Sequence, residues 1–336
     1  MSESRRIAIP EPDPERFAEA TRLAARAREP ALAGRVAFGT AGWTDRTLIS
    51  SGLFYPKGAQ SAQARLAHYA AHFRVVEVDA TYYSLLPPET AQRWARDTPA
   101  DFVFDVKAHP ILTGHPIDTE RLPGDLKQAL GEAKRIYPER LPPEIAGEIE
   151  GRFRALVEPL RAASKLGCVM LQFPPWFAAT RGNARRIAEV AERWHSVPLS
   201  IEFRHPSWLA ETRRARVLEL LSTHRLSYVC VDEPDVRGGG VPPLVVVTNP
   251  GLSLVRFHGH NRAGWLARGA SVHQRFDYLY SPAELSLWVE PAKRLARESS
   301  RVHALFNNCV RNYAVLGAKG LSVLLEAAEG EAPVPT

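Results

Sequence analysis

Residues able to transfer protons or bind anions stand at the ends of eight short apolar segments of this 336-residue chain. Each segment is rich in β-branched or aromatic residues, as buried strands are, and closes in polar or small residues. The segments are Val36–Thr40, Val75–Asp79, Phe102–Lys107, Cys168–Gln172, Leu199–Arg204, Tyr228–Asp232, Leu252–His258 and His303–Asn308. Because side chains alternate between the two faces of a strand, residue order assigns each polar group to a face.

Alternation separates a polar face from an apolar face in these segments. In the fifth segment Glu202 and Arg204 share one face, and Ile201 and Phe203 share the other. The polar faces together carry Glu77, Asp79, Asp105, Lys107, Gln172, Glu202, Arg204, Asp232, Arg256, His258 and Asn308. If helices cover the apolar faces, these groups converge at the carboxyl ends of the strands, where (β/α)8 barrels carry their active sites.

Two glutamates and a histidine are the candidate catalytic groups. Glu77 and Glu202 stand on the predicted second and fifth strands, so they can face each other across a barrel mouth. Burial can keep one carboxyl protonated while the other stays ionised, so Glu202 is the candidate base or acid and Glu77 its partner. His258 would transfer a proton or polarise the substrate. The structural alternative is that the carboxylates only form ion pairs with neighbouring cations.

Three cationic side chains offer a site for an anion. Lys107, Arg204 and Arg256 share the polar face with the carboxylates, and an arginine fork matches the geometry of a phosphate or carboxylate. We therefore expect a small phosphorylated or carboxylated ligand, oriented by Gln172 and Asn308.

Aromatic residues just beyond the predicted strands could stack on a sugar or a base. They are Trp43, Tyr82, Tyr83, Trp176 and Trp208. Aromatic residues near strand ends also serve ordinary core packing, and the sequence leaves both alternatives open.

A divalent metal is an alternative to acid–base chemistry alone. Its oxygen and nitrogen ligands would come from Glu77, Glu202, His205, Asp232 and His258. The sequence contains no H-E-x-x-H motif, and the neighbouring cations would compete with a metal, so we predict neither a metal nor another cofactor.

Helical patterns alternate with the eight segments, which favours parallel strands joined by helical crossovers. We predict an α/β fold, a TIM-type (β/α)8 barrel forming one domain over residues 35–326, with an N-terminal extension at 1–34 and a tail at 327–336. Long loops follow the third and sixth strands, at 108–150 and 233–251, and such loops commonly form lids or substrate walls. Leu244–Val247 is an alternative to Leu252–His258 as the seventh strand.

Composition limits the class of protein and its partners. Hydrophobic residues make up 45% of the chain and charged residues 24%, as in a globular protein, and no apolar stretch approaches the ~20 residues that span a bilayer. We expect a cytoplasmic protein without a membrane partner, because no secretory signal is evident and the three cysteines form no C-x-x-C pair. The net charge of +6 allows nucleic acid as an alternative partner, although the arginines are interspersed with acids. The oligomeric state is left open.

Seven motifs occur in an order that resembles the YecE-like family, or domain of unknown function 72. They are GTAGWTD (Gly39–Asp45), LFYPKG (Leu53–Gly58), the segment Val76–Pro87, QFPPWF (Gln172–Phe177), IEFRHPSW (Ile201–Trp208), VRFHGHN (Val255–Asn261) and FNNC (Phe306–Cys309). The resemblance covers residues 35–325 and implies a TIM-type barrel, but it brings no established reaction.

The polar residues typical of the family fall on positions that alternation largely selects as well. They are Trp43, Glu77, Lys107, Gln172, Glu202, Arg204, His205, Trp208, Arg256, His258, Gly259 and Asn308. Two positions depart from the family's pattern. Asp79 adds a negative charge where asparagine is usual, and the histidine usual after the third strand is shifted to His115.

These observations favour an enzyme, a hydrolase or an isomerase, that acts by acid–base chemistry on a small anionic, sugar-like substrate. Motifs of serine hydrolases, P-loop proteins and dinucleotide-binding domains are absent from the sequence. The alternatives are a non-catalytic binding or sensing barrel and a metal-dependent nucleic-acid-processing barrel.

Overall fold

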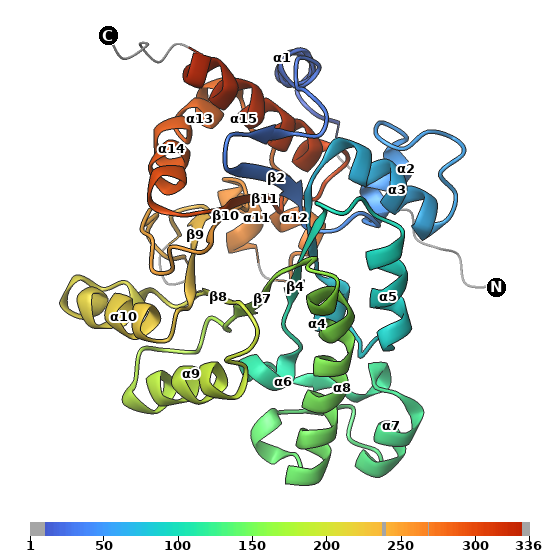
Figure 1. The fold of residues 1–336 in the computed structure, drawn as a ribbon, viewed down its shortest axis with the longest axis vertical. Helices are drawn as coiled ribbons and strands as arrows, with labels where there is room; N and C mark the ends of the chain where they lie inside the picture. Colours follow the sequence, from blue (N-terminus) through green and yellow to red (C-terminus); the bar gives the residue numbers. More distant parts are fainter. Residues whose placement is uncertain (1–10, 237–239, 268, 331–336) are drawn as a thin grey trace.

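Eight parallel strands occupy the centre of the molecule and correspond to the eight predicted segments (Figure 1). The computed structural model describes residues 11–236, 240–267 and 269–330. The strands are β2 (Val36–Thr40), β3 (Val75–Val78), β4 (Val103–Lys107), β7 (Leu166–Gln172), β8 (Leu199–Glu202), β9 (Ser227–Asp232), β10 (Ser253–Phe257) and β11 (Val302–Phe306). Their order is β2-β11-β10-β9-β8-β7-β4-β3, and the short strand β1 (Leu32–Ala33) adds an antiparallel edge to β2, which makes a mixed nine-stranded sheet.

Helices surround the curled sheet and cover its apolar face (Figure 1). The long helix α8 (Pro143–Ala162) buries Phe153, Leu156 and Leu160 at the helical spacing that the sequence shows. The helices after the first strand are α2 (Arg46–Ser51), α3 (Ala62–His72), α4 (Ala80–Tyr83), α5 (Pro88–Arg96), α6 (Pro110–Thr113), α7 (Gly124–Leu130), α8 (Pro143–Ala162), α9 (Arg181–Arg193), α10 (Glu211–Thr223), α11 (Arg262–Leu266), α12 (Val272–Arg275), α13 (Pro282–Ser286), α14 (Val289–Glu298) and α15 (Tyr313–Gly330).

The two ends of the parallel series, β2 and β3, meet through a tyrosine. The Tyr69 hydroxyl accepts a hydrogen bond from the Thr40 backbone N–H at 2.7 Å and donates one to the Val75 carbonyl at 3.1 Å. A single parallel bridge between Ala41 and Glu77 adds the only backbone pairing found between these edges in the described residues. A side chain at Gly39 would place its Cβ 2.1 Å from the Val75 carbonyl oxygen, so the close approach requires glycine there.

The N-terminal extension belongs to the same fold from residue 11 onward. Helix α1 (Pro14–Ala24) packs on α15, where Phe17, Ala20 and Ala24 contact an apolar cluster containing Tyr313 and Leu316. Residues 1–10 of the predicted extension and 331–336 of the predicted tail lie outside the described residues. Helix α15 continues to Gly330, four residues past the predicted boundary at 326.

The loop after β4 contains local structure, whereas the described residues of the loop 233–251 form no helix or strand. The loop after β4 holds α6, α7, the 3-10 turns Thr119–Arg121 and Pro138–Arg140, and a two-stranded ribbon of β5 (Ile117–Asp118) and β6 (Arg135–Ile136). Residues 244–247 are not a strand, so the alternative seventh strand is wrong and β10 is the seventh. None of the described helices combines the length and apolarity needed to cross a membrane.

Candidate functional site

Arg256 lies at the centre of a buried ionic cluster inside the sheet. From β10 it donates to both carboxylate oxygens of Glu77 on β3, Nε to Oε2 at 2.9 Å and Nη2 to Oε1 at 2.8 Å. Its third nitrogen, Nη1, donates to Oε2 of Glu202 on β8. All three side chains are sealed from solvent. One guanidinium therefore links three strands and neutralises two carboxylates, which leaves it no free donor fork for a substrate anion.

Glu202 accepts from donors on both of its oxygens. Besides Arg256, its Oε1 accepts from Gln172 Nε2 at 2.8 Å and from Arg204 Nη1 at 3.1 Å. Gln172 and Glu202 are register partners on β7 and β8, so their side chains share a face, as the alternation predicts. Burial opposes ionisation of Glu202, but Arg256 and the other donors hold its pKa well below the usual value. Because both of its oxygens accept hydrogen bonds, the Glu202 carboxyl stays ionised and is a weak base.

His258 is buried beside the same carboxylate. Its Nε2 lies 3.4 Å from Glu202 Oε1, and its Nδ1 faces the side-chain amide of Asn307 at 3.0 Å. With the Asn307 amide as donor, Nδ1 accepts and the proton sits on Nε2, which is near Glu202 but has no hydrogen-bond partner among the described residues. Burial lowers the pKa of His258 to about 4 despite the nearby carboxylate, so the ring is neutral near pH 7.

Glu233, which sequence analysis missed, completes the cluster. Its carboxylate lies 2.8 Å from Arg204 Nη1, and burial raises its pKa against the effect of that guanidinium. The predicted member, Asp232, faces the other way and accepts from the Tyr280 hydroxyl at 2.6 Å and from His260 Nε2 at 3.0 Å. Its register partner Phe257 also points outward, against the helices. The predicted inward orientation of Asp232 is therefore wrong, and the next residue, Glu233, points inward instead.

The last strand shows the same one-residue offset. Asn308 donates to the Tyr278 carbonyl at 2.8 Å and so points away from the cluster, whereas Asn307 reaches His258. Residues 303, 305 and 307 share the inner face, and counting from His303 would have selected Asn307. The signal was in the sequence, but the predicted segment extended past the true strand end at Phe306.

Three further predicted site residues lie outside the cluster. Trp43 packs edge-on against Trp94 of α5, with ring centroids 5.4 Å apart, and Trp208 is buried in a stack with Phe203 and Phe177. His205 caps the short 3-10 helix Pro206–Trp208 by accepting from the Ser207 N–H at 3.2 Å. Both tryptophans therefore lie in packed aromatic surroundings, as the alternative of ordinary core packing expects.

A second polar layer lies deeper inside the sheet. His303 Nδ1 is 2.8 Å from Asp105 Oδ2, and the Cys168 thiol donates to Asp105 Oδ1 at 3.4 Å. Burial raises the pKa of Cys168, so the thiol stays protonated and unreactive. This layer fills the interior beneath the Arg256 cluster rather than facing solvent.

Lys107 and Asp79 are the charged groups of the site that remain uncommitted. Both are partly exposed, and neither forms an ion pair or a side-chain hydrogen bond with another described residue. The Lys107 ammonium lies 4.9 Å from the centroid of the Tyr82 ring. Burial and then Arg256 lower the pKa of Lys107, whereas burial raises the pKa of Asp79. Both shifts move the groups towards their neutral forms.

The candidate metal ligands are not assembled into a metal centre. Within residues 11–236, 240–267 and 269–330, no three His, Cys, Asp or Glu side chains are grouped so that they could hold an ion. Glu77 and Glu202 are instead bound to Arg256, and Asp232 and His205 lie in separate contacts. The residues present do not fit a divalent ion in this arrangement.

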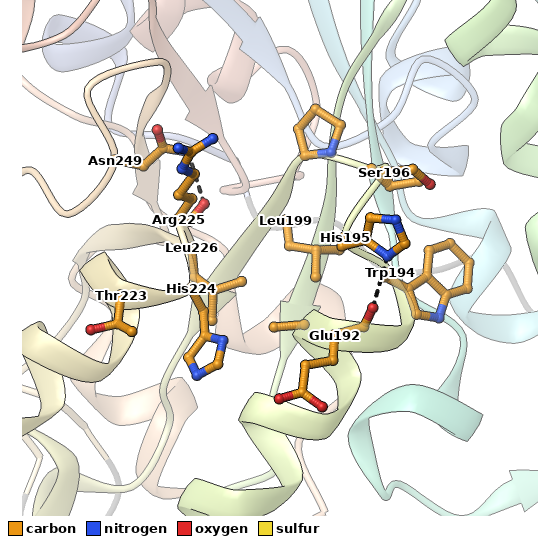
Figure 2. A pocket seen from close by; sticks show the side chains of 13 residues that line it. Glu192, Trp194, His195, Ser196, Leu199, Thr223, His224, Arg225, Leu226 and Asn249 are labelled. Carbon is orange, nitrogen blue, oxygen red and sulfur yellow. Dashed lines mark hydrogen bonds between the residues drawn. The ribbon is translucent and has the colours of Figure 1, made fainter.

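Two hollows of the surface lie at opposite ends of the sheet. One of about 490 Å³ opens at the amino ends of β8 and β9, with His195 and Ser196 on one side and Arg225 and Asn249 on the other (Figure 2). The side-chain amide of Asn249, which lines this hollow, donates from Nδ2 to the Arg225 carbonyl at 2.9 Å and so stabilises a turn. Another, of about 400 Å³, opens beside the carboxyl end of β4 and includes Tyr82, the ring that Lys107 contacts. This second hollow is linked to the polar interior through the contact between Lys107 and Tyr82.

The parallel strands and the helices that cover them place the chain among α/β proteins. The chain belongs to the family described as protein of unknown function DUF72, whose model matches residues 37–336. It is 29% identical over 291 residues to the UPF0759 protein YunF of Bacillus subtilis, covering 86% of this chain and 94% of the relative. It is 24% identical over 300 residues to the UPF0759 protein YecE of Escherichia coli K12, covering 79% and 92%.

Solved structures of the family have the same fold. A DUF72 family protein of Enterococcus faecalis V583 aligns with a TM-score of 0.68 and 26% identity, over 89% of this chain and 97% of that chain. A DUF72 family protein of Thermotoga maritima MSB8 aligns with a TM-score of 0.66 and 29% identity, over 88% and 99%. The predicted family is confirmed.

Proposed function

We propose that this protein is an enzyme that acts by acid–base chemistry on a small anionic substrate, with Lys107 as the proton-transfer group. The observation that carries the proposal is the placement of Lys107 and Asp79, two uncommitted ionisable groups, above a sealed network of paired charges. Burial lowers the pKa of Lys107 and raises the pKa of Asp79, and ionisable groups with such perturbed pKa values are enriched at catalytic sites.

The buried cluster would set the electrostatics of that reaction. Glu77, Glu202 and Arg256 are fixed by reciprocal hydrogen bonds and have no contact with solvent, which suits positioning residues better than groups that touch substrate. A preorganised set of charges in a dry interior acts more strongly on a nearby group than the same charges would in water. Arg256 disfavours the charged form of Lys107, and Glu77 favours it.

The anion would be bound by Lys107 and the cations of the loop after β4. The expected clamp of Arg204 and Arg256 is already engaged by carboxylates, so it offers the substrate little. Lys107, when protonated, has no competing ion pair among the described residues. A phosphate or carboxylate could thus approach it from the hollow beside Tyr82.

We also propose that the eight parallel strands close into a (β/α)8 barrel at the β2–β3 seam. The Tyr69 hydroxyl takes the place of direct strand-to-strand hydrogen bonds there, and Gly39 permits the close approach. Closure would hold Glu77 of β3 against Arg256 of β10 across the interior.

The three unpaired cysteines are consistent with a reducing compartment such as the cytoplasm.

The experiment that tests the function compares metabolite extracts incubated with the protein and with its variants, read by mass spectrometry. We expect at least one small anionic metabolite to be consumed by the wild-type protein and spared by Lys107→Met. The surface variant Arg294→Gln, remote from the site, should behave as wild type. If the wild-type protein converts no metabolite, or Lys107→Met converts the same one at the same rate, the proposal is wrong.

A further inference from the structure

The hollow next to Lys107 gathers the exposed aromatic rings of the molecule. Among the large hydrophobic residues that are exposed in the described chain, three are aromatic, namely Tyr83 (42% exposed), Tyr137 (43%) and Trp176 (57%), and all three line this hollow. They come from α4, from the loop after β4 and from the segment after β7, so separate parts of the sequence converge on one cavity. Exposed aromatic surface gathered in a concave site is typical of ligand binding.

The inner wall of the same hollow is also aromatic. The His115 ring contacts Tyr82 on one side and Trp176 on the other, with centroid distances of 5.2 and 5.8 Å. Burial lowers the pKa of His115 to about 4, and the Lys107 charge acts in the same direction, so the ring is neutral near pH 7. A row of neutral rings leads from Trp176 at the rim to Tyr82 beside the ionic site.

Two arginines supply positive charge at the rim. The Arg121 guanidinium lies 5.2 Å from the centroid of the Tyr83 ring and pairs with Asp118 at 3.3 Å. The side chain of Arg135 on β6 is exposed and forms no ion pair or hydrogen bond with another described residue. The cavity thus combines stacking surfaces with one engaged and one free guanidinium, which suits a planar ring joined to a phosphate.

We propose that this cavity, which we call the aromatic pocket and define by Tyr82, Tyr83, His115, Trp176, Arg121 and Arg135, binds a nucleoside monophosphate. The base stacks on Trp176, and the phosphate lies at Arg135. Its volume of about 400 Å³ falls within the ~300–1,000 Å³ of small-molecule sites. The inference rests on the proposed function only where it identifies this ligand as the substrate. The stacking surfaces and the free guanidinium are observed independently of that function.

Direct binding tests the aromatic pocket, with AMP as the probe and calorimetry or tryptophan fluorescence as the readout. AMP is expected to bind more tightly than adenosine, and ribose 5-phosphate more weakly than either. Trp176→Ala should weaken AMP binding about fivefold or more, since stacking on one aromatic is worth ~1–3 kcal/mol per base. Trp176→Phe should recover most of that loss, and Leu287→Ala, at an exposed position that does not line the pocket, should lose none.

Charge and ligand size separate the remaining outcomes. Arg135→Gln should weaken AMP severalfold and leave adenosine unchanged, which places the phosphate. Equal affinity for AMP and ribose 5-phosphate, or an unchanged affinity in Trp176→Ala, would overturn the stacking assignment. A hexadeoxyadenylate that binds far more tightly than AMP would overturn the single-nucleotide occupant in favour of a nucleic-acid strand. Because binding is measured without turnover, AMP affinity in a protein that converts nothing would leave this inference intact while the proposed enzyme fails.

Discussion

Arg256 and Glu77 form a bidentate ion pair across the interior of the sheet, and both of its hydrogen bonds are shorter than 3 Å. Both side chains are buried away from solvent. The pair joins strands that lie far apart in sequence, and Glu202 shares the same guanidinium. Burying a charged group is costly unless it is paired, so each member of this cluster depends on the others.

Removing the shared guanidinium should destabilise the protein strongly. Arg256→Ala leaves the Glu77 and Glu202 carboxylates buried without their main partner, and breaking such a pair costs about 3–5 kcal/mol. Urea denaturation should show a loss of that size in the free energy of unfolding. The surface variant Arg294→Ala, which removes only an exposed pair with Glu298, should lose less than about 1 kcal/mol. Equal losses in the two variants would contradict the account.

His258 should make stability depend on pH between 4 and 6.5. Its pKa in the folded protein is lowered to about 4 from 6.5, so its contribution is complete above 6.5 and is lost as the pH falls towards 4. His258→Gln should therefore flatten the decline of the unfolding free energy across this window, by up to about 3 kcal/mol at 1.36 kcal/mol per unit. His195→Gln, at an exposed histidine, should leave the decline in place. A slope in His258→Gln as steep as in the wild type would refute the assignment.

The tyrosine at the β2–β3 seam should hold these strands together. Tyr69→Phe leaves the Thr40 N–H and the Val75 carbonyl without their partner, at about 1–3 kcal/mol for a buried unsatisfied group. Hydrogen exchange should accelerate at the Thr40 amide in particular. Tyr137→Phe, which changes an exposed hydroxyl, is the matched control. Unaltered protection at Thr40 would show that the seam does not depend on the hydroxyl.

Trp208 should act on stability rather than on ligand affinity. It is buried in an aromatic stack, and its Nε1 donates to the Phe177 carbonyl at 2.6 Å. Trp208→Ala should cost about 3–5 kcal/mol, whereas Trp176→Ala should cost under about 1 kcal/mol, because Trp176 is mostly exposed. Thermal or urea denaturation of both variants checks the contrast. Comparable losses would mean that the two roles are wrongly assigned.

Alternation of hydrophobic and polar residues predicted the strands well because strand period and burial leave a direct trace in sequence. It placed Glu77, Lys107, Gln172, Glu202, Arg204, Arg256 and His258 on the inner face, where the structure has them. It missed Glu233 and Asn307 because the assignment of a face beyond the last strand residue depends on where the strand ends.

The sequence could not predict which charges would find partners. Arg204 and Arg256 look like free cations in sequence, but the three-dimensional packing commits them to Glu233, Glu202 and Glu77. Lys107 carries the same formal charge and remains unpaired among the described residues. Whether a cation finds a partner depends on distances between segments that are far apart in the sequence, and the spacing of residues along the chain does not reveal these distances.

The most direct test of the central claim is the titration of Lys107 itself. In protein labelled with ¹³C-lysine, the Cε resonances of the seven lysines can be followed against pH, and the one missing in Lys107→Met is that of Lys107. We predict a pKa below the ordinary 10.5, and a further decrease in Glu77→Gln, because the Glu77 charge favours the protonated amine. A Lys107 that titrates at or above 10.5, unaffected by Glu77→Gln, would contradict the proposed role.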